Sequence, residues 1–560
     1  MATNKLLLDY VQEHEASRAG LVFLTQPTGG GQTVDYTWGQ TLEQARRMAT
    51  HIQSQGFEPG FRIAILSKNC AHFIMAELAI WLAGGTTVAI FPTETADTVK
   101  YVLEHSGASM LFVGKLDTWE QQIAGVPAGL PLIAFPLAPK TNYDTWDKVM
   151  ARSKPLTGKI ERKPTDIAIL MYTSGSTGQP KGVMHSFEHA TAAAAGIVDR
   201  LKDNSSTSNL EMRVLSYLPL AHIFERAWIE CSSLVYGRSH IYFADTLETF
   251  VQDLNRARPN IFISVPRLWL KFQQGVLAKM PAKKLDFLLS IPILGRIVAR
   301  KVLTGLGLNE VLMAGSGSAP IPPELVNWYR KLGLNLLEGY AMTEDFAYSF
   351  MSTNDAHAPG CVGVAAPGVK IRFTEEGEIL IKSPGKLVGY YQRPDLDAEV
   401  FTEDGFFHTG DKGEINAQGI LKLTGRVKEL FKTAKGKYVA PAPIENEINS
   451  HPMIEMSMVS GVGQPSAYAL VVLSETIRPK QNDPVFRVEV EKELSALLKR
   501  VNANRADYEQ LRMLVIAPEP WSIENGCLTP TMKIKRARIE TQVAPTVETW
   551  YATKGAVMWA

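Results

Sequence analysis

MYTSGSTGQPKGVMHS, residues 171–186, places hydroxyl side chains, glycines and a single lysine, Lys181, in one short segment. The apolar run Ile167–Met171 at its start is typical of a buried strand. Glycines let the backbone adopt unusual dihedral angles and approach a ligand closely. Exposed N–H groups, hydroxyls and a lysine suit phosphate oxygens. The segment is therefore predicted to be a strand followed by a loop that binds a polyphosphate.

This loop differs from the P-loop of ATPases, which requires Gly-x-x-x-x-Gly-Lys followed by serine or threonine. Here Pro180 precedes Lys181 and Gly182 follows it, so a P-loop ATPase is disfavoured. A polar surface turn is the simpler interpretation of a glycine- and serine-rich segment. We prefer the phosphate loop because composition, residue order and the flanking strand all agree.

The string TSGSTGQPKG, Thr173–Gly182, resembles the signature loop of the adenylate-forming superfamily. That superfamily comprises acyl-CoA synthetases, peptide-synthetase adenylation domains and luciferases. Its members activate a carboxylic acid with ATP to an acyl-adenylate and then pass the acyl group to a thiol. The resemblance implies nucleotide contacts from Thr173, Ser174, Gly175, Ser176, Thr177, Gly178 and Lys181, with Thr173 also near Mg²⁺.

Length and composition describe an ordinary globular protein. The chain has 560 residues, of which 45% are hydrophobic and 21% charged, enough for more than one domain. The net charge of +1 argues against a general nucleic-acid binder. The cysteines, Cys70, Cys231, Cys361 and Cys527, are widely spaced and suggest neither a zinc site nor a disulfide framework.

Neither the N-terminal residues nor the most apolar stretch predicts export or a membrane span. Residues 1–20 lack the apolar core of a secretory signal. The stretch Phe73–Pro92 is interrupted by Glu77 and Gly84, which favours a buried helix, a turn and a strand. We expect a cytoplasmic protein whose membrane contact, if any, is peripheral and at the inner face.

Helical patterns alternate with short β-rich runs through the first half of the chain, which predicts helix-covered parallel sheets. Residues 124–163, rich in proline and lysine, are predicted to be an excursion before the phosphate loop. The expected fold class is α/β. It consists of a large N-terminal domain with a β subdomain around Gly377–Tyr391, and a small mobile α+β C-terminal domain. The resemblance sets these domains at residues 1–428 and 429–560, with Lys428 at the hinge.

Two further strand-to-turn segments are predicted beside the phosphate loop, because ligands gather at the carboxyl ends of parallel strands. Residues 311–322, VLMAGSGSAPIP, resemble the superfamily's adenine-side loop, and residues 334–344, LNLLEGYAMTE, resemble its GYGxTE motif with Ala341 replacing a glycine. By this resemblance Tyr340 stacks on adenine, Thr343 touches phosphate and Glu344 holds Mg²⁺. The other nucleotide-side residues are Gly315, Ser316, Gly317, Glu338 and Gly339.

The C-terminal third carries three more matches. FHTGD ends in Asp411, the expected acceptor of the ribose hydroxyls, and LTGRVKEL contains Arg426, expected at ribose or phosphate. LTPTMKIKR, residues 528–536, resembles the catalytic-lysine motif, which assigns that role to Lys533 with Lys535 as the competitor. Gly436 is expected to line the CoA channel.

YLPLAHIFER, residues 217–226, resembles the long-chain acyl-CoA synthetase branch. By that resemblance His222 lies near the substrate carboxylate and acts in the thiol step, although a packing role is an equal alternative. Trp228 is predicted either to gate an acyl tunnel or to be a core residue. Depth of the acyl pocket, and hence chain length, is left open, as is the oligomeric state.

Lysines at positions 271, 279, 283 and 284 lie beside apolar residues of the range Leu285–Ile297. They are predicted to form a solvated helical face, with a peripheral membrane contact as the alternative.

The resemblance therefore predicts a long-chain fatty-acid–CoA ligase that uses ATP, Mg²⁺ and CoA. One alternative is an acyl-AMP ligase that loads an acyl carrier protein. An alternative of another class is a non-catalytic lipid-binding relative, which the presence of Lys533, Glu344 and Asp411 disfavours.

Overall fold

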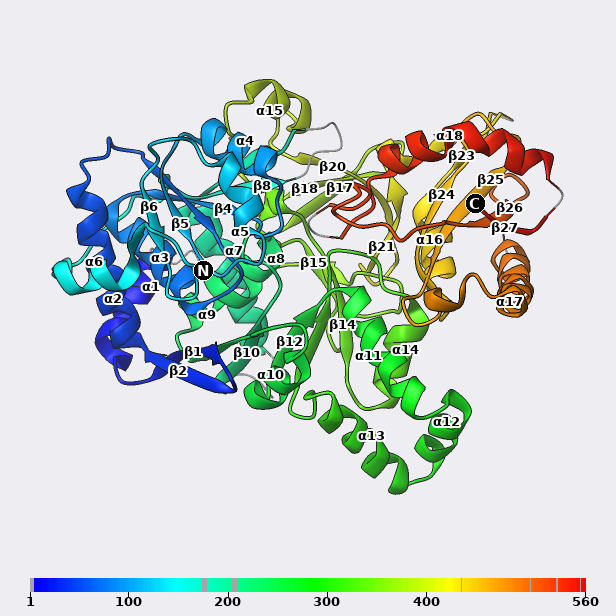
Figure 1. The fold of residues 1–560 in the computed structure, drawn as a ribbon, viewed down its shortest axis with the longest axis horizontal. Coiled ribbons are helices and arrows are strands. Elements are labelled where there is room, and N and C mark those ends of the chain that lie inside the picture. The colour runs from blue at the N-terminus through cyan, green and yellow to red at the C-terminus, as the bar shows by residue number, and fades with distance from the viewer. Residues whose placement is uncertain are drawn as a thin grey trace.

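The computed structural model describes residues 5–173, 179–203, 210–434, 436–503, 505–529, 532–553 and 555–560. Figure 1 shows a large N-terminal part beside a smaller C-terminal part. The predicted α/β fold class is confirmed, and the C-terminal part is indeed the smaller. No described helix has the length and apolar character that a membrane span requires.

The main sheet of the N-terminal part has eight strands, and the phosphate-loop segment borders it. In spatial order the strands are β19 (Gly389–Tyr390), β9 (Lys181–Ser186), β8 (Ile167–Thr173), β4 (Thr86–Ile90), β3 (Arg62–Leu66), β5 (Ala108–Val113), β6 (Leu132–Ala134) and β7 (Asp144–Thr145). Neighbouring strands from β8 to β7 run parallel, whereas β9 runs antiparallel to both of its neighbours, β8 and β19.

Helices cover both faces of this sheet because its central strands are apolar on both sides. Ile63 and Ile65 of β3 face one hydrophobic cluster, while Ala64 and Leu66 face another. The helices of this region are α1 (Leu7–Arg18), α2 (Trp38–Ser54), α3 (Ala71–Ala83), α4 (Ala96–Ser106), α5 (Trp119–Gln122), η1 (Ile123–Gly125), α6 (Trp146–Arg152) and α7 (Phe187–Asp203). Parallel strands buried on both faces are the expected core of such a fold.

Local sequence signals fix where these helices begin and end. Thr37 accepts a hydrogen bond from the Gln40 amide at the start of α2. Gly84 ends α3 with φ of 101°, a left-handed conformation that glycine adopts without steric cost. Such caps supply hydrogen bonds to helix-terminal groups that the helix itself leaves without partners.

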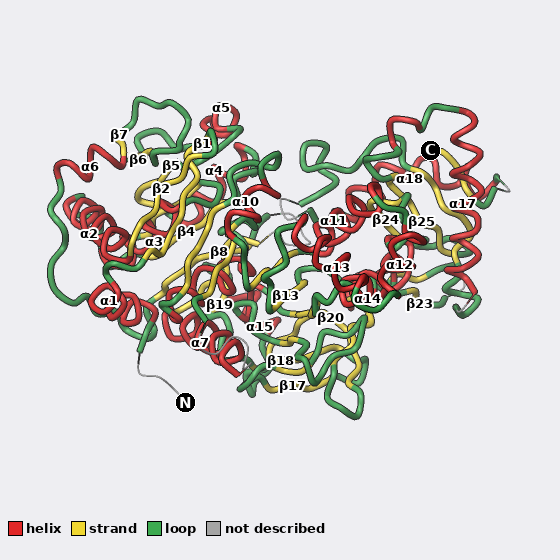
Figure 2. The backbone as a smooth tube through the Cα atoms, turned by 90° about the horizontal axis from the view of Figure 1, so that it is seen from below, coloured by secondary structure: helices red, strands yellow, loops and turns green. Residues whose placement is uncertain are grey.

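Two more sheets complete the N-terminal core. One has the order β10 (Met212–Ser216), β11 (Ser239–Phe243), β1 (Val22–Gly29), β2 (Gln32–Thr37); the other has β12 (Ile261–Ser264), β13 (Met313–Ser316), β14 (Leu336–Tyr340), β15 (Phe350–Met351), β16 (Val364–Ala365). Their helices are α8 (Ile223–Glu225), η2 (Arg226–Cys231), α9 (Ser232–Tyr236), α10 (Phe250–Ala257), α11 (Pro266–Lys279), α12 (Ala282–Ser290), α13 (Leu294–Gly305), α14 (Pro323–Lys331) and η3 (Thr343–Asp345). Figure 2 shows the sheets as separate groups of strands.

A β subdomain and the smaller part follow. The subdomain sheet is β17 (Lys370–Phe373), β18 (Glu378–Lys382), β20 (Phe407–Ile415) and β21 (Leu421–Arg426), with α15 (Pro394–Val400) nearby. The smaller part has β22 (Phe431–Lys432) paired with β23 (Tyr438–Val439), and a sheet of β24 (Ile454–Ser460), β25 (Ala467–Leu473), β26 (Leu511–Ile516) and β27 (Val557–Trp559). Its helical segments are η4 (Val427–Glu429), α16 (Pro441–Asn449), η5 (Arg478–Lys480), α17 (Pro484–Ala503) and α18 (Arg536–Ala552).

The prediction that residues 124–163 form only an excursion before the phosphate loop is revised. Residues 124–163 are more than an excursion, because they contribute β6 and β7 to the edge of the main sheet and the short helix α6. Trp146 of α6 is fully buried, and its indole N–H donates to Gln44 Oε1 at 2.8 Å. The strands and the helix could not be predicted from composition, because proline and lysine are common in loops.

Candidate active site

The phosphate-loop segment begins at the carboxyl end of β8, where Thr173 pairs with Lys181 of β9. The predicted residues Ser174, Gly175, Ser176, Thr177 and Gly178 lie outside the described residues. Across the neighbouring strand β19, the Lys181 ammonium lies 5.4 Å from the centre of the Tyr390 ring. The Tyr390 hydroxyl donates to Glu344 Oε1 at 2.8 Å. The base of the loop and the predicted metal ligand thus belong to one contact network.

The turn that carries Thr343 and Glu344 is held from two sides. His185 Nε2 donates to the Thr343 carbonyl at 2.8 Å, and burial lowers the pKa of His185 to about 3, so its ring is neutral. Asp345 accepts the Met342 amide at 3.0 Å. Burial also raises the pKa of Asp345 to about 7. This turn is therefore fixed largely by buried polar groups whose charge is suppressed.

Asp411 connects the end of β14 to β21. It accepts the Tyr340 hydroxyl at 2.7 Å and the Arg426 Nε–H at 2.8 Å, one on each carboxylate oxygen. Burial and the adjacent Asp411 charge raise the pKa of Tyr340 well above its usual range, so the phenol stays a donor. Hydrogen bonds to a charged acceptor are among the stronger ones, so the three side chains form a rigid group.

Lys533 of the smaller part faces this group. Desolvation by the surrounding protein lowers the pKa of Lys533, and the positive charge of Arg426 lowers it further. The charges of Asp411 and Glu344 act in the opposite direction. The residue nevertheless stays accessible to solvent. Lys533 therefore lies within electrostatic range of both the Asp411 group and the Glu344 turn.

The competitor Lys535 has a different neighbour. Burial raises the pKa of Glu94 to about 7, and Lys535 partly offsets this rise. Glu94 belongs to the segment after β4, which also carries Phe91, whose ring centre lies 6.4 Å from that of His222. Both lysines thus reach across to the N-terminal part, but Lys533 faces the Asp411 group.

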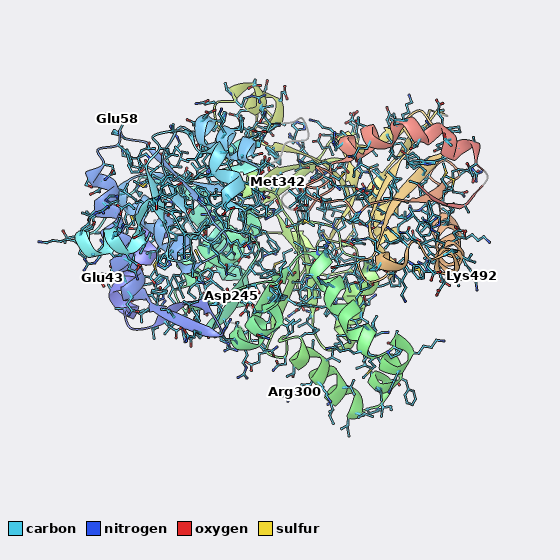
Figure 3. The ribbon with its side chains drawn as sticks, in the orientation of Figure 1. Glu43, Glu58, Asp245, Arg300, Met342 and Lys492 are labelled. Atoms are coloured by element: carbon cyan, nitrogen blue, oxygen red, sulfur yellow. The ribbon has the colours of Figure 1, made fainter. Side chains whose placement is uncertain are left out.

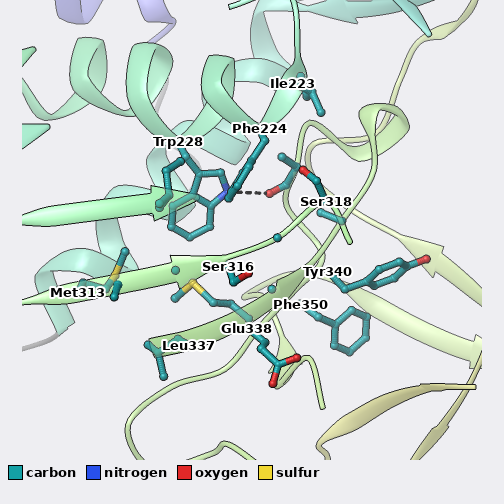
Figure 4. Close-up of a pocket in the computed structure, with 18 of the residues that line it drawn as sticks. Ile223, Phe224, Trp228, Met313, Ser316, Ser318, Leu337, Glu338, Tyr340 and Phe350 are labelled. Carbon is teal, nitrogen blue, oxygen red and sulfur yellow. Dashed lines mark hydrogen bonds between the residues drawn. The ribbon is translucent and has the colours of Figure 1, made fainter. Parts of the chain in front are cut away.

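A pocket with an empty volume of about 590 Å³, its mouth included, lies between α8, η2, β13 and β14. Figure 4 shows Phe224 and Trp228 on one side and Ser316, Leu337 and Tyr340 on the other. The Trp228 indole N–H donates to the Ala347 carbonyl at 3.2 Å. Trp228 lines the pocket and also packs against the main core cluster.

The predicted glycines Gly315, Gly317 and Gly339 lie in or just after β13 and in β14, and all three line the pocket. A Cβ atom on Gly317 would lie 3.2 Å from the Phe224 ring, and one on Gly315 would lie 3.3 Å from Ile263. On Gly339 it would meet only the Phe350 carbonyl, at 3.4 Å. Ser316 Oγ is buried and has no hydrogen-bond partner among the described residues. It is therefore available to a ligand in the pocket.

Two titratable residues that line the pocket, Glu338 and His222, are neutral at pH 7. Burial raises the pKa of Glu338 to about 8, and its carboxyl group accepts the Gly360 amide at 3.0 Å. Burial lowers the pKa of His222 to about 3, with Lys533 as the second cause. His222 Nδ1 accepts the Phe224 amide at 3.2 Å, which leaves the proton of the neutral ring on Nε2.

The sequence did not reveal what holds the His222 segment. Asn69 accepts the Leu220 amide at 2.9 Å, and Arg226 Nε donates to the Leu220 carbonyl at 2.9 Å. Arg226 is fully buried, donates to Glu77, and has Glu230 at 3.3 Å. The available signal was Glu77 itself, a charged residue inside the most apolar stretch, since such residues are rarely buried without a partner.

A parallel α/β fold, a glycine-rich phosphate segment and a lysine brought in by a second part define a nucleotide-dependent enzyme class. The chain belongs to the AMP-binding enzyme family, whose pattern it matches over residues 11–391. Residues 429–555 match the C-terminal domain of the AMP-binding enzymes. The predicted membership of the adenylate-forming superfamily is thereby confirmed.

Relatives cover nearly the whole chain. It is 28% identical to the long-chain-fatty-acid–CoA ligase FadD15 of Mycobacterium tuberculosis, over 97% of this chain and 96% of the relative. It is also 28% identical to long chain acyl-CoA synthetase 4 of Arabidopsis thaliana, over 94% of this chain and 88% of the relative.

Solved structures share the fold. The adenylation domain of the carboxylic acid reductase of Segniliparus rugosus, in complex with AMP and a co-purified carboxylic acid, superposes with a TM-score of 0.81 at 22% identity. The match covers 98% of this chain and 94% of that domain. The anthranilate CoA ligase AuaEII, in complex with anthranoyl-AMP, gives a TM-score of 0.77 at 18% identity, covering 97% and 98% of the two chains.

Proposed function

We propose that this chain is an AMP-forming long-chain fatty-acid–CoA ligase, and that the predicted site residues act in it as assigned. The observation that carries the proposal is that Lys533 lies within electrostatic range of Asp411, Glu344 and His222, the last of which lines an apolar pocket. The names of the relatives, long-chain-fatty-acid–CoA ligase and long chain acyl-CoA synthetase, support the acyl class.

In the first half-reaction a fatty carboxylate oxygen attacks the α-phosphorus of ATP. The bond to pyrophosphate breaks, and an acyl-adenylate remains. Negative charge develops on the phosphate oxygens, so fixed positive charges aimed at them lower the barrier. Lys533 and Lys181 supply those charges in our proposal. Asp411 binds the ribose hydroxyls with Arg426 beside it, and Tyr340 packs on the adenine.

Mg²⁺ fits the residues present. It is commonly held by one or two carboxylates together with substrate phosphates. Glu344, positioned by Tyr390 at 2.8 Å, and Thr173 at the end of β8 would hold it. When bound, it would neutralise charge on the phosphate oxygens.

In the second half-reaction the thiol sulfur of CoA attacks the acyl carbonyl, and AMP leaves. We propose residues 1–428 and 429–560 as the two domains, with rotation about Lys428 withdrawing Lys533. Support comes from the position of Lys428 in η4, between β21 and β22, and from the C-terminal match that begins at residue 429. Gly436 would line the CoA channel, and neutral His222 would lie near the acyl carbonyl. We further propose a cytoplasmic location.

The test is pyrophosphate release with ATP, Mg²⁺ and acids from acetate to palmitate, with and without CoA. We expect turnover with long acids that depends on CoA. Lys533→Ala should lower adenylation by about 10²–10³-fold yet retain thioester formation from supplied acyl-adenylate. Lys535→Ala is the matched control and should adenylate normally. A CoA-insensitive adenylate burst would instead indicate a carrier-protein ligase, and silence with every acid would refute the proposal.

A further inference from the structure

The helices α12 and α13 form a hairpin at one edge of the N-terminal part. They project from the body in Figure 1, and Figure 3 places Arg300 of α13 at that edge. Leu285 of α12 and Ala299 of α13 are buried. A Cβ atom on Gly295 would lie 2.5 Å from the Leu289 carbonyl oxygen, so the two helices touch closely there. The hairpin is therefore a packed element with one outward face.

That outward face is unusually apolar. Phe287 is 66% exposed, Ile293 74%, Leu294 40% and Ile297 59%. Single exposed apolar residues are ordinary, but a contiguous group of large ones marks an interaction surface. These four lie on α12, on the turn, and on the first turn of α13. They are referred to below as the apolar tip.

The turn itself is strained. Ile293 has φ of 67° and ψ of −58°, and the Leu294 amide donates to the Pro292 carbonyl at 2.8 Å. This is the rarer γ-turn, which costs energy for a β-branched residue. Strain of this kind persists where the surroundings enforce it and is concentrated at functional sites. Here its effect is to expose an isoleucine at the end of the hairpin.

Basic residues flank the apolar tip along the chain. They are Lys279, Lys283, Lys284, Arg296, Arg300 and Lys301, all exposed. In the described part of the chain none of them forms an ion pair. Asp286, the sole acidic residue of this range, is paired with Lys331 at 3.0 Å. The range 279–301 therefore presents strong positive charge in a protein whose net charge is +1.

Helical spacing interleaves the two kinds of side chain. Lys283 and Lys284 precede Phe287 by four and three residues, and Arg300 and Lys301 follow Ile297 by three and four. Residues at these spacings share one helix face. Long basic side chains can then extend past buried apolar groups to reach charged head groups. Lys271, by contrast, lies 3.9 Å from Glu475 of the smaller part and does not belong to this face.

We propose that the α12–α13 hairpin docks this protein on an anionic lipid bilayer. The apolar tip enters the boundary between head groups and acyl chains, and the basic residues contact anionic head groups. Charge complementarity favours an anionic bilayer as the occupant of this surface. An uncharged apolar partner would leave six cationic groups beside the interface without negative charges to pair with. The hairpin follows strand β12 and helix α11 in the chain, and β12 contributes Ile263 to the pocket. The docked hairpin is therefore joined through α11 to a strand that lines the pocket.

The test is sedimentation of the full chain with vesicles of phosphatidylcholine, with and without phosphatidylglycerol, in the absence of substrate. We expect binding to the anionic vesicles that weakens as salt is raised. The triple variant Phe287→Ser, Ile293→Ser, Ile297→Ser should lower the partition coefficient at least tenfold. Its matched control replaces Leu247, Val485 and Val488, exposed by 91%, 80% and 67%, with serine and should bind like the wild type.

Charge is tested by Lys283→Gln with Lys284→Gln, which should weaken binding by about fivefold for each lysine removed. The control pair Lys492→Gln and Lys499→Gln on α17 should have no effect. The proposal is overturned if the wild type ignores anionic vesicles, or if the controls lose as much binding. It is also overturned if the triple serine variant converts an oligomer to a monomer with vesicle binding unchanged, because the tip is then a self-interface.

The binding assay does not depend on the proposed ligase activity. A chain that binds vesicles but releases no pyrophosphate with any acid would retain this proposal and lose the other. Conversely, the triple serine variant should keep wild-type pyrophosphate release with a short, soluble acid in the absence of vesicles.

Discussion

Replacing Arg226 with methionine should lower the free energy of unfolding by about 3–5 kcal/mol, the usual effect of leaving a buried charge without its partner. Arg226 has no exposed surface, and neither does Glu77, to which it donates. Glu230 lies 3.3 Å from Arg226 Nε and is also buried. Burial raises the pKa of Glu230 well above its usual range, with the Glu77 charge as a second cause. Glu77 is therefore the charge that Arg226 balances.

The assay is denaturant unfolding followed by circular dichroism. Arg372→Met is the matched control: its ion pair with Asp404 is 2.9 Å long, but the side chains are 45% and 55% exposed. Exposed pairs contribute about 1 kcal/mol or less. If charge balance is the cause, adding Glu77→Gln to Arg226→Met should restore part of the loss. A loss below about 1 kcal/mol, or strictly additive effects of the two substitutions, would refute this reasoning.

Three further outcomes are expected. Burial raises the pKa of Glu225 to about 8, so the native state holds a proton that the unfolded state releases near pH 4.5. The contribution of Glu225 to stability should thus fall as pH rises from about 4.5 to 8, and Glu225→Gln should remove this contribution, which amounts to up to about 1.4 kcal/mol per pH unit in unfolding titrations. Trp228→Ala should shift the preference in pyrophosphate release towards bulkier or longer acids, and an unchanged preference would exclude it from the acyl wall. Arg267 of the N-terminal part forms an ion pair with Glu455 of the smaller part. The substitution Arg267→Glu should slow adenylation more than thioester formation. Adding Glu455→Arg should restore the adenylation rate in the double variant.

Much of the fold followed from local sequence signals. Strand β3, Arg62–Leu66, coincides with a short apolar run in the sequence, and α2 begins at Trp38, where apolar residues start to recur at helical spacing. These elements are long or strongly patterned, and their ends carry caps such as Thr37. Strand β7, with two residues, has no such pattern, because its position depends on pairing with β6 rather than on its own side chains.

In the candidate site, too, some residues could be predicted from the sequence and others could not. Motif residues such as Asp411 and Lys533 could be named because each belongs to a recognisable string. Asn69 and Glu77 belong to no motif, and their contacts with the His222 segment join residues about 150 positions apart. Such contacts are set by how the sheets pack, so sequence spacing carries no trace of them. The same reason explains why Lys271 was grouped with the basic hairpin, although it lies near Glu475 of the other part.

The position of Lys533 links the two proposed half-reactions through charge. While Lys533 lies beside His222, its positive charge adds to burial in lowering the pKa of that imidazole. Rotation about Lys428 would remove this charge from the pocket, so the proton affinity of His222 would rise as the thiol arrives. The same movement would relieve Lys533 of its repulsion from Arg426, which lowers its pKa in the present arrangement. Withdrawal of Lys533 would therefore remove, in one movement, its stabilisation of the phosphate and its effect on the pKa of His222.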